Sequence, residues 1–280
     1  MNNAIYPCLT LKGRIAEASA FYQDAFASAR VLQTSPIVIQ LEVHGQKLML
    51  LNDGPTALPN PSISLMVVAA TAEETEHSWN KLSEGAQVLM GLDSYPWSSK
   101  YGWLQDKYGV SWQLFTATEE DKTQKICPTM MFTGALAGKA TEAVHYYTSV
   151  FPGSSVEGIL HYSEGEGEPL DYVKHAQFDI DHYTMMAMDS GLDHKFGFND
   201  AISMVVECDN QAQIDQYWDE LTHNGGREVA CGWLVDRYGV SWQIIPKALT
   251  TLLKDPERAQ RVMPVLLKMK KLVIADLEQA

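Results

Sequence analysis

The sequence lacks the features that mark membrane, secreted and nucleic-acid-binding proteins. Its 280 residues hold no apolar run near the roughly 20 residues of a membrane helix, and the N-terminus lacks the basic and apolar segments of a signal peptide. Four cysteines without a CxxC pair are too few for a disulfide framework. Acidic residues outnumber basic ones by 35 to 21. The resulting negative charge repels the phosphate backbones of nucleic acids and anionic lipids. We therefore expect a cytoplasmic protein with neither nucleic acid nor a membrane as partner.

Motifs of covalent and nucleotide chemistry are missing as well. The chain has no GxSxG, HExxH or P-loop motif, so covalent nucleophilic catalysis lacks support. The glycines of Gly165-Glu-Gly167 lie in an acidic loop, residues 161–169, with no strand before them and no helix after them. Carboxylates in this loop would oppose a phosphate, so the loop is not a nucleotide or S-adenosylmethionine fingerprint.

The sequence does contain an internal repeat. Residues 102–113 (GWLQDKYGVSWQ) recur as residues 232–243 (GWLVDRYGVSWQ), with ten of twelve positions identical at an offset of 130 residues. Weaker similarity extends both ways, and residues 40–54 align without gaps with residues 177–191. We expect two domains, residues 1–118 and 124–248, joined by a polar link and followed by a C-terminal helical extension, residues 249–280.

Hydrophobic periodicity predicts the same order of elements twice in each copy: strand, helix, strand, strand, strand. In the first copy, helices are expected over residues 15–27 and 71–83. Strands are expected over residues 5–11, 36–43, 47–51, 63–68, 88–90, 101–106 and 111–116. The tail reads as helix with breaks near Pro256 and Pro264, and its apolar stripe would pack on the chain itself or on a second subunit. The fold class is therefore α+β, with paired βαβββ units.

These paired units resemble the vicinal oxygen chelate superfamily, which includes glyoxalases, extradiol dioxygenases and bleomycin-resistance proteins. Asp-Lys/Arg-Tyr-Gly-Val-Ser-Trp-Gln, at residues 106–113 and 236–243, is similar to the signature of its PhnB-like group, often labelled 3-demethylubiquinone-9 3-methyltransferase-like. Residues 128–134 and 261–272 also resemble that group. The resemblance implies two tandem domains, each a pair of units forming a cupped mixed sheet. It leaves the chemistry open, because the superfamily hosts many reactions and some pure binders.

The resemblance also implies where a metal would lie. The usual ligands are His, Glu or Gln, and the last-strand position falls on Gln113 and Gln243. The first-strand positions, near Cys8 and Thr129, offer no imidazole, and the middle strands offer no His or Glu. A conventional site cannot be assembled from these residues. We expect no cofactor, and a divalent metal, if one bound, would use Gln113 or Gln243.

Strand alternation places Ser111, Gln113 and Phe115 on one face and Trp112 and Leu114 on the other. By resemblance the glutamine face lines the cup, while Trp112 and its counterpart Trp242 pack under a helix. His175 is open to two interpretations, a general base or ligand, or a solvent-facing strand histidine. The cup-lining candidates for ligand binding are Gln113, Gln243, Gln40, Gln177, His175, Trp103 and Trp233.

Three functions remain, and no catalytic residue is identified. The first is a small-molecule binding protein of this fold without the usual metal centre. The second is a glyoxalase- or dioxygenase-type metalloenzyme with an atypical site. A methyltransferase ranks last, because no glycine-rich strand–loop–helix is present to bind its cofactor. Whether the chain is an enzyme, which small molecule it binds and whether it forms a homodimer stay open.

Asp106 and Asp236 are expected to stabilise the turns that end at the following glycines.

Overall fold

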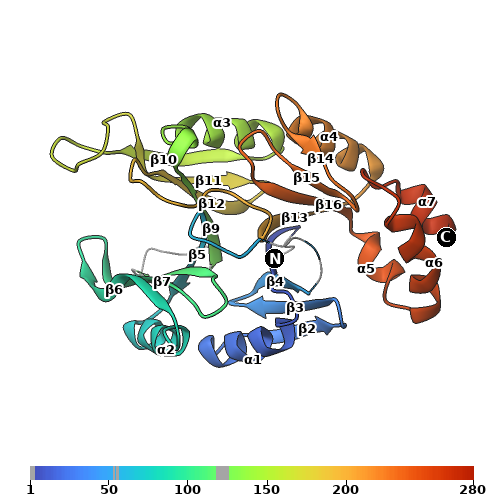
Figure 1. The fold of residues 1–280 in the computed structure, drawn as a ribbon, viewed down its shortest axis with the longest axis horizontal. Coiled ribbons are helices and arrows are strands. Elements are labelled where there is room, and N and C mark those ends of the chain that lie inside the picture. The colour runs from blue at the N-terminus through green and yellow to red at the C-terminus, as the bar shows by residue number, and fades with distance from the viewer. Residues whose placement is uncertain (1–3, 53, 55–56, 118–125) are drawn as a thin grey trace. The chain divides into compact units, whose positions relative to one another are not determined.

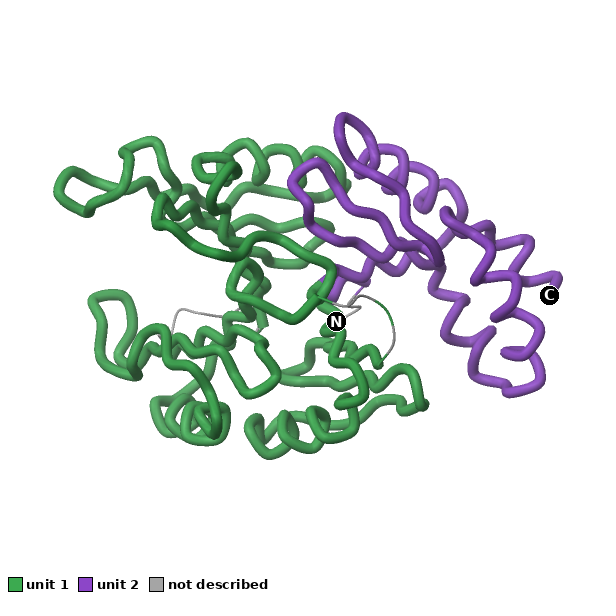
Figure 2. Tube along the Cα trace, in the orientation of Figure 1, with its two compact units in different colours: residues 1, 7–202 green, residues 2–6, 203–280 purple. Residues whose placement is uncertain are grey.

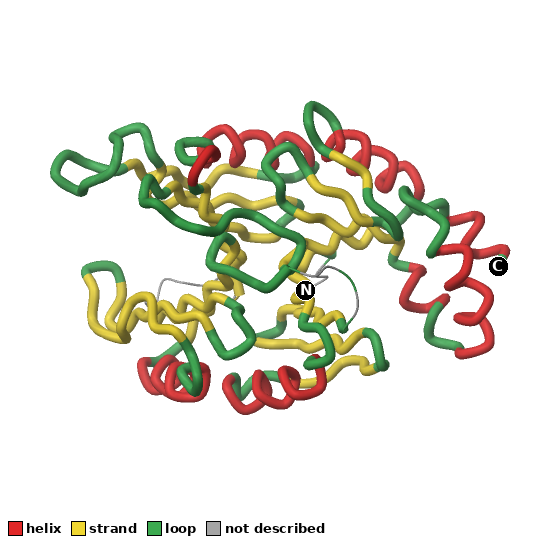
Figure 3. Tube along the Cα trace, in the orientation of Figure 1, coloured by secondary structure: helices red, strands yellow, loops and turns green. Residues whose placement is uncertain are grey.

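The computed structural model describes residues 4–52, 54, 57–117 and 126–280. The polar link expected over residues 118–124 lies outside the described residues. Two mixed sheets of eight strands each are formed by the described chain, and helices pack on them (Figures 1 and 3). The α+β fold built from repeated βαβββ units is confirmed. In addition, none of the helices in the described ranges is long and apolar enough to cross a membrane.

Four units follow one another along the described chain, and a short helical tail comes after them. The first comprises β1 (Ile5–Thr10), α1 (Ile15–Ala25), β2 (Arg30–Thr34), β3 (Val38–Val43) and β4 (Gln46–Leu51). The second comprises β5 (Ile63–Ala69), α2 (Ala72–Leu82), β6 (Gln87–Tyr95), β7 (Ser98–Gln105) and β8 (Ser111–Thr116). The third comprises β9 (Ile126–Phe132), the 3-10 turn η1 (Gly134–Leu136), α3 (Ala140–Val150), β10 (Ser155–His161), β11 (Val173–Ile180) and β12 (Tyr183–Asp189). The fourth comprises β13 (Ile202–Cys208), α4 (Gln211–Thr222), β14 (Arg227–Glu228), β15 (Trp233–Val235) and β16 (Ser241–Pro246). The tail holds α5 (Ala248–Leu252), α6 (Pro256–Leu266) and α7 (Ile274–Gln279).

Each sheet takes one unit from each copy of the repeat. Sheet A has the order β14-β15-β16-β13-β1-β4-β3-β2, and sheet B has the order β10-β11-β12-β9-β5-β8-β7-β6. In sheet B the two copies meet where β5 pairs antiparallel with β9. Contacts along the chain divide it into two compact units, residues 7–202 and residues 203–280 with the segment before residue 7 (Figure 2). These units follow spatial contacts rather than the repeat, and the domain boundaries at residues 118, 124 and 248 stay a prediction.

Local sequence accounts for the ends of several elements. The Thr71 hydroxyl accepts a hydrogen bond from the Glu74 amide at 3.2 Å and caps α2, and the Glu74 carboxylate accepts one from the Ala70 amide at 2.8 Å. The two bonds form a capping box in which the carboxylate accepts from the amide of residue 70 rather than from that of the cap residue itself. His44 and Gly45, with φ of 50° and 78°, form the two-residue turn between β3 and β4. Both features agree with the sequence pattern.

A buried carboxylate holds the turn that leads into β8. Asp106 Oδ1 accepts the backbone N–H groups of Tyr108 and Val110 at 2.8 and 3.0 Å. Its Oδ2 accepts the Trp112 indole N–H and the Tyr22 hydroxyl, each at 2.9 Å. Burial raises the pKa of Asp106 above its usual value, although all four donors oppose that rise. The turn chemistry predicted for this aspartate is confirmed.

The same aspartate ties β8 to α1. Trp112 is fully buried, and its ring lies 5.2 Å from Tyr22 and 5.1 Å from Phe26, both on α1. The predicted packing of Trp112 under a helix is therefore confirmed. In the fourth unit, Asp236 Oδ1 accepts the amides of residues 238 and 240, and its Oδ2 accepts the indole N–H of Trp242 at 2.9 Å. The repeated sequence thus repeats its turn in space.

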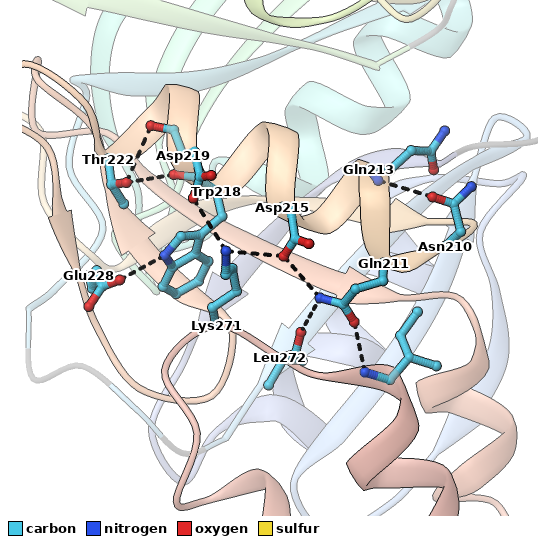
Figure 4. Close-up of polar contacts among 11 residues, drawn as sticks. Asn210, Gln211, Gln213, Asp215, Trp218, Asp219, Thr222, Glu228, Lys271 and Leu272 are labelled. Carbon is cyan, nitrogen blue, oxygen red and sulfur yellow. Dashed lines mark hydrogen bonds and ion pairs between the residues drawn. The ribbon is translucent and has the colours of Figure 1, made fainter.

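The tail packs on its own chain through buried leucines and one valine: Leu252, Val262, Leu266, Leu272 and Leu277. Polar contacts fix its path along α4 (Figure 4). Lys271 reaches Asp215 and Asp219 at 3.1 and 3.3 Å. The Gln211 side chain donates to the Leu272 carbonyl at 3.0 Å and accepts from the Ile274 amide at 2.9 Å. The expected second break is wrong: Pro256 begins α6, but Pro264 lies inside it, two residues before its end.

Candidate ligand-binding face

The register of sheet B brings several predicted site residues onto one face. Gln113 on β8 lies between Met66 on β5 and Trp103 on β7. Register partners point to the same side of a sheet, so these three side chains share a face. The same face continues across the sheet. Gln177 on β11 is the register partner of Met186 on β12, and Met186 is in turn the partner of Thr129 on β9. Thr129 pairs with Ser64 on β5. We call this surface of sheet B the glutamine face.

The helices of this sheet cover its other face. Gly102 follows the alternation away from Trp103, and a Cβ added there would come within 2.5 Å of the Trp79 ring on α2. Phe178 alternates with Gln177, and its ring stacks on Tyr147 of α3 at 6.4 Å. Because α2 and α3 pack on the opposite side, the glutamine face keeps half-exposed apolar side chains. These are Met66, Trp103, Phe115 and Met188.

A hydrogen-bonded network fixes Gln113 at the middle of this face. The Tyr101 hydroxyl donates to Gln113 Oε1 at 2.7 Å, and Gln113 Nε2 donates to the Ser64 hydroxyl at 2.7 Å. Burial raises the pKa of Tyr101, so its hydroxyl stays protonated and remains a donor. Beside them, the Trp103 indole N–H donates to the Ser111 hydroxyl at 2.7 Å. Gln113 itself is only 4% exposed, so it forms the floor of the face.

His175 lies on the same face, at its β11 end. Its register partner on β12 is Met188, because the neighbouring pair is Ala176 with Ala187. The side chain is exposed, yet its surroundings desolvate the ring and lower the pKa of His175 below its usual value. A neutral imidazole suits a ligand or a base at neutral pH. Among the described residues, no side chain bonds the imidazole and orients it for either role.

The other candidates belong to sheet A. Gln243 lies beside Trp233 in the second compact unit, and its Nε2 donates to the Ser203 hydroxyl at 2.9 Å. Position 231, which the repeat aligns with Tyr101, is a cysteine. Gln40 lies opposite Met49 in the first compact unit. The structure thus brings Gln113, Gln177, His175 and Trp103 onto one face, while Gln243 and Trp233 share a strand pair elsewhere.

The donor set of the glutamine face does not fit the divalent metal that this kind of fold implies. Among the described residues, no three His, Cys, Asp or Glu side chains gather closely enough to hold an ion. The Gln113 amide already has Tyr101 and Ser64 as partners, and its neighbours on the face are thioethers, rings and hydroxyls. Hard divalent ions bind carboxylate and imidazole ligands in preference to these groups. No chemical step is therefore assigned to a metal here.

Two members of this site, Tyr101 and Ser64, were not among the sequence-based candidates. Ser64 could have been found, because Ile-Ser is conserved between the copies at residues 63–64 and 202–203. Tyr101 could not, because its counterpart is a cysteine and its bond to Gln113 depends on β7–β8 pairing.

A surface hollow of about 400 Å³ lies between the start of α4 and α7, and no predicted site residue lines it.

Comparison with known proteins identifies the family. The family model described as 3-demethylubiquinone-9 3-methyltransferase matches residues 3–115 and 124–245. The chain belongs to this family. Its two matched segments correspond to the two copies of the repeat, and its fold is shared with glyoxalase I. The resemblance stated from the sequence is thereby confirmed.

Solved structures agree at the level of the fold. Glyoxalase I from Zea mays is 11% identical, with 86% of this chain and 93% of that chain covered at a TM-score of 0.59. A PhnB protein from Bacillus cereus is 34% identical and covers 39% of this chain and 96% of its own, with a TM-score of 0.38. No curated protein matches the chain. At 11% identity the maize enzyme shows the shared fold and nothing about the reaction.

Proposed function

We propose that this family member is a small-molecule binding protein that holds its ligand on the glutamine face of sheet B, without the metal centre usual in the fold. The observation that carries the proposal is the Tyr101–Gln113–Ser64 network, surrounded by half-exposed apolar side chains. Small-molecule sites combine an apolar lining with a few oriented polar groups. The glutamine face has both features.

The network leaves capacity for a ligand. A carboxamide has two N–H donors and two acceptor lone pairs on its oxygen, and Gln113 uses one of each. The Tyr101 hydroxyl donates to Oε1 and the Ser64 hydroxyl accepts from Nε2, so both ends of the amide are held in place. A ligand reaching the floor of the face would meet a fixed N–H and a fixed carbonyl. Trp103 and Met66 would supply the apolar contact area.

Titration with Nile red, a neutral apolar dye, tests this placement. Trp103→Ala should weaken dye binding about tenfold, since it removes a half-exposed ring from the face. Trp233→Ala is the matched control, because it removes the repeat counterpart from a different strand pair, and it should leave the dissociation constant unchanged. Equal dissociation constants for wild type and Trp103→Ala would show that the face is not the binding surface.

Metal analysis tests the second half of the proposal. The purified protein should carry no stoichiometric transition metal, and added Zn²⁺, Ni²⁺ or Mn²⁺ should not change its thermal stability. A stoichiometric metal that disappears in Gln113→Ala would overturn the metal-free proposal and favour a metalloenzyme. Calorimetry with S-adenosylmethionine completes the set, because tight binding would favour a methyltransferase over both alternatives.

A further inference from the structure

The two copies of the repeat differ in the length of the hairpin that β6 and β7 form in the first copy. In the first copy, Gln87 on β6 pairs with Gln105 on β7 across 17 intervening residues. In the second, Arg227 on β14 pairs with Val235 on β15 across seven. The first hairpin is therefore ten residues longer, although Gln105 and Val235 are aligned by the repeat. An extension present in one copy alone is not needed to build the common fold.

The extension carries a cluster of aromatic rings. Tyr95 and Trp97 stack at 5.1 Å with planes 23° apart, and both lie edge-on to Tyr101 at 5.6 and 5.9 Å. Tyr101 donates to Gln113, so the cluster adjoins the floor of the glutamine face. Trp97 remains 50% exposed, although it is a large apolar side chain. A stacked tryptophan exposed to this extent has a ring surface available to a further ring.

The corresponding place in the second copy is filled by the chain itself. The amides of Cys231 and Gly232 donate to the carbonyls of Met269 and Lys270, both at 2.8 Å. Leu272 packs on Gly232, where a Cβ would come within 3.1 Å of Leu272 Cδ1. The tail therefore occupies the end of the short hairpin. The aromatic cluster lies in the first copy, so the two copies differ in structure at this hairpin.

Charge near the cluster favours a cation. Asp93 on β6 is the register partner of Tyr101, so its carboxylate lies on the side of the aromatic rings. It is exposed, and it accepts a hydrogen bond from the neighbouring Ser94 amide at 2.7 Å. Lys100 on β7 pairs with Glu76 of α2 at 2.8 Å and also interacts electrostatically with the Asp93 carboxylate. Ring faces also attract positive charge, and the chain as a whole has a net charge of −14.

We propose that the hairpin β6–β7 is the specificity element of the glutamine face, and that it selects ligands with a planar, positively charged aromatic group. The group stacks on the free face of Trp97, and Asp93 balances its charge. The inference rests on the proposed function, because it concerns the same ligand. It places the planar, charged end of that ligand at Trp97 and its polar end toward Gln113.

Fluorescence titration with 9-aminoacridine, a planar cation at neutral pH, tests the inference. Trp97→Ala should weaken its binding at least tenfold, the range expected for loss of one stacked ring, and Trp97→Tyr should retain most of the affinity. Asp93→Asn should weaken binding of the cation severalfold. Acridine-9-carboxylate has the same ring system with opposite charge and should bind at least tenfold more weakly to the wild type.

The outcomes separate this inference from the proposed function. If Trp97→Ala leaves 9-aminoacridine binding unchanged while Trp103→Ala abolishes Nile red binding, the face binds ligands and the hairpin inference is wrong. Failure of 9-aminoacridine to bind the wild type, or equal affinity for the acridine carboxylate, also overturns the inference. Light scattering of wild type and Trp97→Ala completes the test. A change in the mass of the assembly would indicate that Trp97 contacts a second molecule of the protein, and it would overturn the inference.

Discussion

Asp106 gives the sharpest test of how this fold is held together. Its carboxylate accepts four hydrogen bonds at 2.8 to 3.0 Å from Tyr108, Val110, Trp112 and Tyr22, and all lie within the first compact unit. Asp106→Ala leaves all four donors without their acceptor. Asp106→Asn keeps Oδ1 for the two backbone amides but puts an NH₂ group against the indole and phenol donors. The two variants therefore separate the turn from the contact with α1.

The magnitudes follow from the number of bonds lost. Hydrogen bonds to a charged acceptor contribute about 1.5–3 kcal/mol each, so losing the two at Oδ2 costs about 3–6 kcal/mol before any offset. Burial raises the pKa of Asp106, which shows that the charge itself is costly, and the neutral amide avoids that cost. We expect a net loss of about 2–3 kcal/mol for Asp106→Asn and about 4 kcal/mol or more for Asp106→Ala. A domain has only about 5–15 kcal/mol of stability, so the alanine variant approaches unfolding.

Urea denaturation followed by tryptophan fluorescence measures these losses as shifts of the unfolding midpoint, provided that the m value does not change. Tyr22→Phe serves as the graded control, because it removes a single bond to Asp106 and should cost about 1 kcal/mol. The reasoning is refuted if Asp106→Asn unfolds within about 0.5 kcal/mol of the wild type. That result would mean that the indole and phenol donors find other acceptors, so that the carboxylate does not join β8 to α1.

Three further predictions concern other parts of the structure. Gln113→Ala removes two buried side-chain hydrogen bonds and should cost about 2 kcal/mol in urea denaturation, against about 1 kcal/mol for Gln243→Ala, and equal losses would contradict the difference between the copies. The lowered pKa of His175 means that protonation opposes folding, so wild-type stability should fall as the pH drops below about 6.5, and His175→Gln should lose less between pH 7.5 and 5. Gln211→Ala frees the tail backbone and should speed its proteolysis, whereas Lys271→Ala removes exposed ion pairs and should cost less than about 1 kcal/mol.

Several elements were predictable because their causes are local. The capped start of α2 needs only Thr71 and Glu74, and the turn at Asp106 needs only the residues that follow it. Period-two alternation placed Gln113 and Trp112 on opposite faces of β8, and the structure agrees. The β2 strand was missed, because its exposed residues carry no alternation. The reach of β6 to Tyr95 was missed because Gly91 and three register shifts interrupt the pattern.

By itself, the sequence determined the repeat, the order of elements and the face on which each glutamine lies, because these depend on neighbours along the chain. Only the tertiary structure decided which units share a sheet. The pairing of β5 with β9 joins one copy to the other, and no local signal encodes a partner strand. The same holds for the bond from Tyr101 to Gln113 and for the tail segment on Gly232. The glutamine face depends on the β5–β9 pairing and on the Tyr101–Gln113 bond, whereas its residues were predictable one strand at a time.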